Sequence, residues 1–224
     1  MTSRDTILGA LRRAIGPAAN DAARRKAVQT RLSEHPRGLI PARGQLPADE
    51  RIALFRKMLE DVSASVETVK AESEIPAAVA GWLRRRNAPQ SLVHGADPHI
   101  RDMPWQDEAE LKRREGKAAG DDVTGLSRAV CGVAETGTLM LLSGPDNPST
   151  INFLPENHII VISAADIEGD YESAWDRLRA IKGDGIMPRT VNLVTGPSRS
   201  ADIEQTLLLG AHGPRALHVI IVED

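Results

Sequence analysis

The spacing of apolar residues divides the chain into a helical first part and a later part in which strands and helices alternate. In the first 90 residues, apolar side chains recur every three or four positions, as in Ile7, Leu11 and Ile15. This spacing predicts amphipathic helices. Helices are expected over 1–15, 20–35, 49–62 and 73–86, with a short strand at 66–69.

The later part contains continuous apolar runs, which are typical of strands buried on both faces. Strands are expected at 91–93, 129–133, 139–142, 158–162, 190–195 and 217–222, with helices at 166–181 and 201–209. This alternation predicts an α/β fold whose sheet is flanked by helices. The predicted organisation is an N-terminal helical segment over 1–88 and an α/β domain over 89–224, together forming one compact unit.

The first candidate for chemistry is the stretch Ala134-Glu135-Thr136-Gly137-Thr138, which lies between two apolar runs. An apolar run on each side of a short polar segment predicts two strands that meet at a bend. Gly137 can adopt a positive φ and lets another backbone or a ligand approach closely. The Glu135 carboxylate at this bend is a candidate catalytic group, and an ordinary turn is the alternative.

A second candidate is the predicted strand–loop–helix over 190–209. Ligands in open α/β sheets bind at strand carboxyl ends and near helix N-termini. The loop could bind an anion through backbone amides, hydroxyls and one guanidinium. These groups belong to Gly196, Ser198, Arg199 and Ser200. Asp202 would lie in the first helical turn. There its negative charge stabilises the helix by interacting with the helix dipole, and it would repel a bound phosphate. An anion site and a well-capped turn therefore both remain open.

Histidines give a weaker signal. His212 lies in Gly210-Ala211-His212-Gly213-Pro214 and could transfer protons near neutral pH, although a structural role is the alternative. His158 begins an apolar strand and is expected to be a hydrogen-bonded core residue. No helical histidine spacing indicates a metal site. A catalytic triad built on Ser198 or Ser200 would lack the G-x-S-x-G pattern of a nucleophile elbow.

Composition narrows the class of protein. The 28 Lys+Arg and 31 Asp+Glu residues leave a net charge of −3, which argues against a nucleic-acid partner. No apolar stretch is long enough to span a bilayer, and the N-terminus lacks the apolar core of a signal peptide, so a cytoplasmic location is expected. Cys131 is the single cysteine, and it cannot form an internal disulfide, a structural zinc site or an iron–sulfur cluster site.

Four sequence blocks together resemble the LUD domain of the lactate utilisation protein C family. The blocks are Ala134-Glu135-Thr136-Gly137-Thr138, Leu154-Pro155-x-x-His158, the run Thr195–Glu204, and Gly210-x-His212-Gly213-Pro214. The resemblance covers about residues 90–224. It implies a fold like that of the ribose-phosphate isomerase and CoA-transferase group, which is also seen in formyltetrahydrofolate cyclo-ligase. It also implies a role in bacterial oxidation of L-lactate to pyruvate, beside two partner proteins of which at least one carries iron–sulfur clusters.

Two functional hypotheses follow. In the first, the chain is a subunit of an L-lactate-oxidising system that lacks a redox centre of its own, docks onto iron–sulfur partners and can bind a small anionic metabolite. In the second, it is a free-standing isomerase, transferase or cyclo-ligase with Glu135 as base or nucleophile and His212 as a second catalytic candidate. Candidate substrate contacts are Thr136, Gly137, Thr138, Gly196, Ser198, Arg199, Ser200 and Asp202. A third hypothesis is a regulatory or assembly protein that has no catalytic or binding site. The polar segment 97–121 would then be a docking loop rather than a lid.

Overall fold

The chain folds into two compact units, Met1–Leu39 and Ile40–Asp224. The computed structural model describes residues 2–16, 21–200 and 208–223. The first unit contains the helices α1 (Ser3–Ile15) and α2 (Ala22–Glu34). The division between the units lies earlier than the boundary predicted at 88–89. The reason is that β1 (Ser65–Val69) pairs with β12 (Ala216–Val222), which ties residues 40–88 to the sheet of the second unit.

A wholly parallel six-stranded sheet forms the centre of the second unit. Its strand order is β1-β12-β7-β4-β2-β3. The four further strands are β2 (Ser91–His94), β3 (Lys112–Glu115), β4 (Thr124–Arg128) and β7 (Asn157–Ser163). Every neighbouring pair in this sheet is parallel. Parallel strands require crossover connections, which carry helices to the faces of the sheet.

A smaller mixed sheet lies beside the first, in the order β8-β5-β6-β9. Its strands are β5 (Cys131–Val133), β6 (Thr138–Leu142), β8 (Ile167–Glu168) and β9 (Val191–Val194). β5 and β6 are the antiparallel pair predicted on either side of the 134–138 bend. A third, two-stranded sheet joins β10 (Arg199–Ser200) to β11 (Leu208–Leu209).

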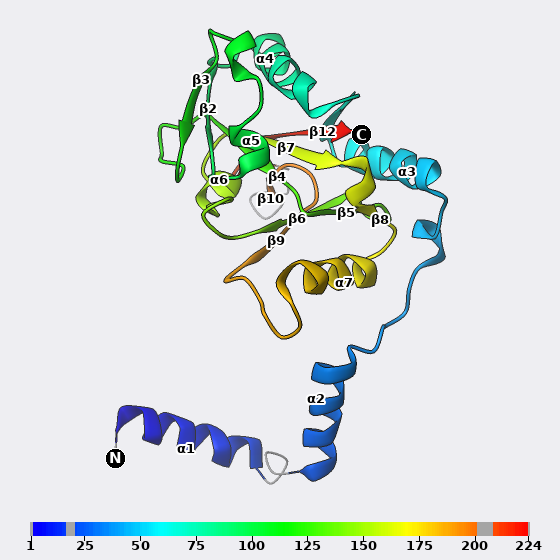
Figure 1. The fold of residues 1–224 in the computed structure, drawn as a ribbon. Coiled ribbons are helices and arrows are strands. Elements are labelled where there is room, and N and C mark those ends of the chain that lie inside the picture. Colours follow the sequence, from blue (N-terminus) through cyan, green and yellow to red (C-terminus); the bar gives the residue numbers. More distant parts are fainter. Residues whose placement is uncertain (1, 17–20, 201–207, 224) are drawn as a thin grey trace. The chain divides into compact units, whose positions relative to one another are not determined.

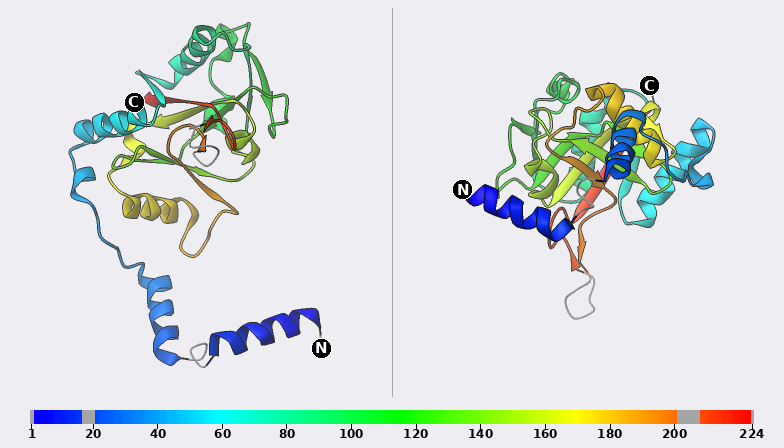
Figure 2. Two further views of the ribbon diagram at one scale, coloured as in Figure 1. Left: turned by 180° about the vertical axis from the view of Figure 1, so that it is seen from behind. Right: turned by 90° about the horizontal axis from the view of Figure 1, so that it is seen from below.

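The second unit also contains helices that pack against the two sheets. They are α3 (Ala48–Asp61), α4 (Ile75–Arg85), α5 (Pro98–Arg101), α6 (Thr150–Phe153) and α7 (Tyr171–Lys182). Short 3-10 turns are η2 (Ala42–Gly44), η3 (Glu72–Glu74), η4 (Trp105–Asp107) and η5 (Ala164–Asp166). Figure 1 shows α4, the six-stranded sheet, the smaller sheet and α7 in successive layers, and Figure 2 shows the same order from behind.

Alternating side chains along the central strands build these layers. On β7, Ile159 and Val161 join the core under α4, whereas Ile160 and Ile162 face the smaller sheet. The apolar core between the two sheets also contains Phe55 of α3. A third core, which lies between the smaller sheet and α7, is filled by Cys131, Val133, Met140, Leu142, Ala174 and Leu178. The mixed α/β architecture with a helix-flanked parallel sheet is therefore confirmed.

Three predicted elements differ from the structure. The helix expected from 166 begins at Tyr171, because Asp170 caps it and Ile167 instead pairs with Gly132 in the smaller sheet. The strand expected at 190–195 is not fully buried, since β9 is an edge strand and Leu193 is 44% exposed. Of the helix expected at 201–209, residues 201–207 lie outside the described part of the chain, and Leu208–Leu209 form β11.

The polar segment 97–121 is more ordered than a simple surface loop. It forms α5, η4 and the edge strand β3, whose four residues are all exposed. Trp105 and Leu111 are buried as predicted, and Ile100 and Met103 are buried beside them. Four buried apolar side chains anchor this segment to the core under α4, so most of it belongs to the body of the fold.

Candidate functional site

Glu135 lies in the turn between β5 and β6, and its side chain is turned into the protein. The residue is only 4% exposed, and its carboxylate atom Oε2 is buried without a hydrogen-bond partner. Its backbone N–H donates to the carbonyl of Gly169 at 3.2 Å. A buried carboxylate oxygen without a donor costs free energy, and such groups concentrate at functional sites. Glu135 therefore stays the central candidate, and its catalytic role remains a prediction.

Two glycines hold the backbone around Glu135. A Cβ atom on Gly44 would lie 2.0 Å from the carbonyl oxygen of Gly169 and 3.3 Å from Cβ of Glu135. A Cβ atom on Gly169 would lie 2.3 Å from the Gly44 oxygen. Beside this contact, Gln45 Nε2 donates to Asp170 Oδ2 at 2.8 Å, and Asp170 caps α7 through the Ser173 N–H. Segments that are distant in sequence thus meet beside the backbone and Cβ of Glu135.

Gly137 shapes the turn that carries Glu135. Its φ of 67° is positive, as the sequence predicts. A Cβ atom here would lie 2.8 Å from the backbone N of Leu59 and 2.9 Å from the carbonyl carbon of Met58. The turn therefore packs directly on the backbone of α3, which only glycine allows.

A network of four hydroxyls joins the two candidate stretches. Thr138 Oγ1 lies 2.7 Å from Thr136 Oγ1, 2.8 Å from the Tyr171 hydroxyl and 2.7 Å from Thr195 Oγ1. Thr136 Oγ1 also donates to the Tyr171 hydroxyl at 3.1 Å. Thr195 directly precedes the loop that begins at Gly196, so the Thr138–Thr195 contact connects the 134–138 turn to the second candidate loop. Neither Tyr171 nor Thr195 is among the candidate site residues predicted from the sequence.

Removing one hydroxyl from this network tests how much the network contributes to the stability of the fold. Tyr171→Phe is expected to lower the free energy of unfolding by about 0.5–1.5 kcal/mol, because the Thr136 and Thr138 hydroxyls lose a partner in a partly buried site. The measurement is urea unfolding of the full chain. Thr138→Ser, which keeps the central hydroxyl, is the matched control. Equal stability of Tyr171→Phe and the parent protein would show that the network contributes nothing.

The loop at 196–200 is tied to the end of α3. Gly196 has a φ of 79°, and a Cβ there would lie 2.8 Å from the Val62 side chain. The Arg199 guanidinium donates to the carbonyl of Val62 and, at 2.9 Å, to the hydroxyl of Ser63. The first of these contacts satisfies a carbonyl at the end of α3, where a helix leaves carbonyls free. Arg199 thus has a capping role in the structure, and anion binding by this loop remains a prediction.

The remaining predicted residues lie around this loop. Ser198 N–H donates to the Pro214 carbonyl at 2.8 Å, and Ser198 Oγ accepts from the backbone N–H of His212 at 3.3 Å. The His212 residue is exposed, and within 208–223 and 21–200 no described contact joins it to Glu135. Ser200 is half-buried and pairs with Leu208 in the two-stranded sheet. Asp202 lies outside the described residues.

His158 is the buried, hydrogen-bonded core residue that the sequence predicts. Its Nε2 atom lies 3.0 Å from Ser127 Oγ, which donates to Asn147 and Asn152 as alternative acceptors at 3.0 and 3.3 Å. Burial lowers the pKa of His158 to about 3, so the imidazole is neutral. This polar cluster pins the loop that contains Asn147, together with α6, onto β4.

His218 is a second buried histidine, held between β1 and α4. Its ring stacks on Trp82 at 5.0 Å, and its Nδ1 atom lies 2.8 Å from Ser65 Oγ. Its Nε2 atom is 3.7 Å from Glu67 Oε2, beyond hydrogen-bond distance. Burial lowers the pKa of His218 to about 4, partly offset by the Ser65 carbonyl.

The buried histidines His158 and His218 predict a loss of stability in mild acid, and His94 adds to it because burial lowers its pKa as well. The unfolded chain takes up a proton on His158 and on His218 near pH 6.5, whereas the folded chain does so only near pH 3 and pH 4. The free energy of unfolding should therefore fall by about 1.4 kcal/mol per pH unit for each of these two histidines between pH 6 and its folded pKa, with no contribution above pH 6.5. Urea unfolding between pH 7 and pH 5 measures this slope. His218→Gln is expected to reduce this slope without removing it, and a slope that is flat over this range would contradict the assignments of His158 and His218.

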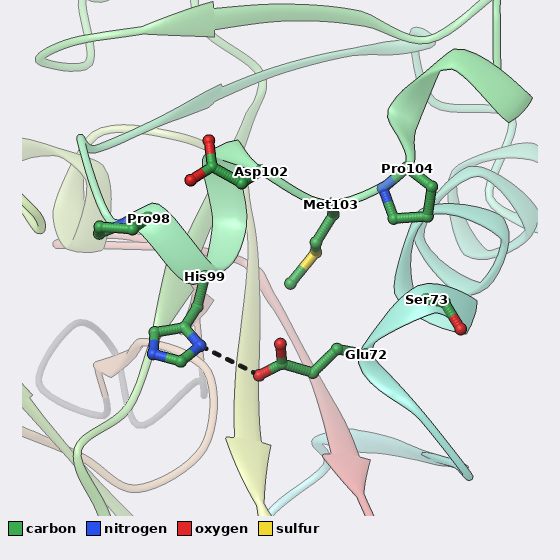
Figure 3. A pocket seen from close by; sticks show the side chains of 7 residues that line it. All are labelled: Glu72, Ser73, Pro98, His99, Asp102, Met103 and Pro104. Atoms are coloured by element: carbon green, nitrogen blue, oxygen red, sulfur yellow. Dashed lines mark hydrogen bonds and ion pairs between the residues drawn. The ribbon is translucent and has the colours of Figure 1, made fainter.

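A separate open hollow of about 360 Å³ lies beside η3 and α5. It is lined by Glu72, Ser73, Pro98, His99, Asp102, Met103 and Pro104. Figure 3 shows the His99 ring and the Glu72 carboxylate facing one another, with His99 Nδ1 and Glu72 Oε1 3.3 Å apart. Asp102 is paired instead with Arg101 at 2.8 and 2.9 Å. No sequence pattern predicts this hollow, and none of its lining residues belongs to the two candidate stretches.

Two further observations concern redox and metal chemistry. Cys131 is buried in the core under α7, and burial raises the pKa of its thiol to about 12. The thiol is therefore protonated and inert near neutral pH. Across 2–16, 21–200 and 208–223, the structure contains no group of three or more His, Cys, Asp or Glu placed to hold a metal ion. No helix in these ranges is long and apolar enough to cross a membrane.

Comparison with known proteins identifies the family. The sequence profile of the LUD domain matches residues 52–222, which include both candidate stretches and both sheets. The chain belongs to the LUD domain family. A crystal structure of a DUF162 family protein from Deinococcus radiodurans has the same fold, with a TM-score of 0.59 and 24% identity over 79% of this chain and 99% of that one.

Curated relatives of this LUD-domain chain include proteins of lactate utilisation. Lactate utilisation protein C of Geobacillus kaustophilus is 30% identical over 180 residues, covering 71% of this chain and 72% of the relative. The Bacillus subtilis protein of the same name is 32% identical over 121 residues, covering 54% and 50%. An uncharacterised protein of Neisseria meningitidis is 35% identical over 153 residues, covering 65% and 64%. The chain thus spans between half and two thirds of the length of several curated relatives.

Proposed function

We propose that this LUD-domain chain is a component of the bacterial L-lactate utilisation system, in which L-lactate is oxidised to pyruvate. The observation that carries the proposal is its similarity to lactate utilisation protein C of Geobacillus kaustophilus, which extends over 71% of this chain and 72% of that protein. A cytoplasmic location is part of the same proposal.

In this proposal the electrons of lactate pass to iron–sulfur clusters on partner subunits. The chain has one cysteine, whereas iron–sulfur clusters are held by several cysteine thiolates. The one thiol is also buried with a pKa raised to about 12, which opposes the thiolate form that binds metals. The chain would accordingly act beside the redox subunits, without a redox centre of its own.

Within that role, the turn around Glu135 is the proposed site for a small anionic metabolite. The buried carboxylate would act as a base or nucleophile toward a bound molecule, and the unpartnered Oε2 atom supports that role because it leaves a lone pair free. Contacts to the metabolite are proposed for Thr136, Gly137, Thr138, Gly196, Ser198, Arg199, Ser200 and Asp202. His212 is the second catalytic candidate, and its exposed position would leave it accessible to a substrate.

A free-standing isomerase, transferase or cyclo-ligase is the alternative function. The same Glu135 carboxylate favours it, since CoA transferases of the fold group that the sequence resembles use a glutamate as nucleophile. This alternative predicts that the purified chain alone converts a phosphosugar, an acyl-CoA or a folate.

A tagged pull-down separates the two functions. The chain would be purified under mild conditions from cells grown on L-lactate, with cells grown on pyruvate as the control. The eluate would be assayed for iron and for lactate-dependent reduction of a dye. Iron and activity from lactate-grown cells are expected. A single clean chain without iron or activity would contradict the subunit proposal and favour the free-standing enzyme.

A further inference from the structure

The end of α3 lies beneath both candidate stretches. A Cβ atom on Gly137 would lie 2.8 Å from the backbone N of Leu59. A Cβ atom on Gly196 would lie 2.8 Å from the side chain of Val62. Both turns thus pack directly on the last part of the same helix, which makes the helix end a common support for the two stretches.

α3 ends in a backbone motif that favours glycine, but a serine occupies the position where glycine is usual. The N–H of Ser63 donates to the carbonyl of Glu60 at 2.9 Å, and the N–H of Ala64 donates to the carbonyl of Leu59 at 3.0 Å. This pair of bonds is a Schellman motif, whose left-handed residue is usually glycine. Ser63 is that residue, with a φ of 70°. Because a Cβ atom disfavours this conformation, the ending of the helix does not by itself explain the serine.

α4 ends in the same motif with a more usual residue. The N–H of Asn87 donates to the carbonyl of Arg84 at 3.0 Å, and the N–H of Ala88 donates to the carbonyl of Leu83 at 3.0 Å. Asn87 is the left-handed residue here, with a φ of 51°. Asparagine is enriched in this conformation, whereas serine is not.

The contacts of the Ser63 hydroxyl give a reason for the serine. Its Oγ atom accepts from Nη2 of Arg199 at 2.9 Å, and the same nitrogen donates to the carbonyl of Val62. Two acceptors at the end of α3 therefore hold one nitrogen of the guanidinium. Hydrogen bonds from a charged donor are stronger than those between neutral groups, so they are well suited to fix the position of a loop.

Two separate routes connect the 196–200 loop to the 134–138 turn. Directly before the loop, Thr195 Oγ1 lies 2.7 Å from Thr138 Oγ1. Near the other end of the loop, Arg199 is bound to the end of α3, on which the 134–138 turn packs. A site that draws on both stretches needs a fixed geometry between them, since small displacements of contacting groups weaken binding and catalysis. The second route depends on the Ser63 hydroxyl.

We propose that Ser63 is a positioning residue of the candidate site, whose hydroxyl holds Arg199 and thereby fixes the 196–200 loop relative to the Glu135 turn. This inference rests on the proposed binding of a small metabolite by these two stretches. Serine then occupies a position at which glycine would suit the backbone better, because glycine has no side chain that could bind Arg199.

Ser63→Gly separates positioning from stability. The urea midpoint of the full chain is expected to equal or exceed that of the parent protein, because glycine relieves the left-handed backbone. Exchange of the Ser198 amide hydrogen, which is bonded to the Pro214 carbonyl, should become about tenfold faster, because the loop loses a hydrogen bond to a charged group. In complexes purified with the tagged chain from lactate-grown cells, the KM for L-lactate should rise by about tenfold with little change in kcat.

Two further variants make the test specific. Ser63→Asn tolerates the left-handed conformation and keeps an acceptor oxygen for Arg199, so it should restore the slow exchange and the parent KM. Asn87→Gly changes the equivalent position at the end of α4 and is the matched control. It should alter neither the exchange of the Ser198 amide nor the KM.

The two readouts also separate this inference from the proposed function. Parent-like exchange of the Ser198 amide in Ser63→Gly would overturn the inference, and so would a parent-like KM despite faster exchange. A raised KM that Ser63→Asn does not restore would overturn it as well. Absence of lactate-dependent activity from the parent complex would instead contradict the proposed function, and faster exchange in Ser63→Gly would still show that Ser63 holds the loop.

Discussion

Glu135→Gln is expected to abolish the growth on L-lactate that the parent chain restores to a strain lacking the gene, while leaving the fold at least as stable. Loss of a general base or nucleophile costs about 100-fold or more in rate. The substitution keeps the shape of the side chain and removes a charge whose Oε2 atom is buried without a partner. The free energy of unfolding should therefore rise, by about 1 kcal/mol.

The two readouts together distinguish a functional carboxylate from a structural one. Glu110→Gln, at an exposed position in the 97–121 segment, is the control and should change neither growth nor stability. If Glu135→Gln supports growth as well as the parent protein does, Glu135 has no catalytic role. If it loses both growth and stability, the carboxylate is a structural group.

Gly44→Ala is expected to lower the free energy of unfolding by more than about 4 kcal/mol, among the largest effects of a single methyl group. The added Cβ would lie 2.0 Å from the Gly169 carbonyl oxygen, which is backbone and accepts the Glu135 N–H. No side-chain rotation can relieve this contact, so η2 must separate from the turn that follows β8. Growth on L-lactate should be lost as well, because this contact holds the backbone of Glu135.

Gly120→Ala provides the matched control for chemical denaturation. A Cβ at Gly120 meets nothing within 4 Å, so this variant should be as stable as the parent protein or more stable by about 0.4–1 kcal/mol. Equal unfolding of Gly44→Ala and the parent protein would show that the two backbones are not in contact.

The sequence predicted the architecture well where one pattern dominates. The continuous apolar run at 158–162 indicates a strand buried on both faces, and β7 lies at the centre of the parallel sheet with cores on both sides. The predicted start of the helix at 166 was wrong because the apolar periodicity does not show which acidic residue caps the helix. Asp166 resembles a helix start, but the true cap is Asp170, because Ile167 and Glu168 pair with β5. The exposed face of β9 was missed since edge position depends on strand order, which spacing alone does not contain.

For the candidate site, the sequence indicated Glu135 and the positive φ of Gly137 because both depend on a local turn. It missed Gly44 and Tyr171, which come from segments far away along the chain. Only the fold brings them to the turn, through the Gly44–Gly169 contact and the Tyr171–Thr138 hydrogen bond. The capping role of Arg199 was hidden for the same reason, since Val62 and Ser63 precede it by more than 130 residues.

Growth of a deletion strain on single carbon sources tests the proposed function most directly. The gene would be removed from its own organism, and growth on L-lactate would be compared with growth on pyruvate, each with and without the gene restored on a plasmid. The proposal predicts loss of growth on L-lactate, normal growth on pyruvate and full rescue by the plasmid. Unchanged growth on L-lactate in the deletion strain would contradict a role in lactate utilisation.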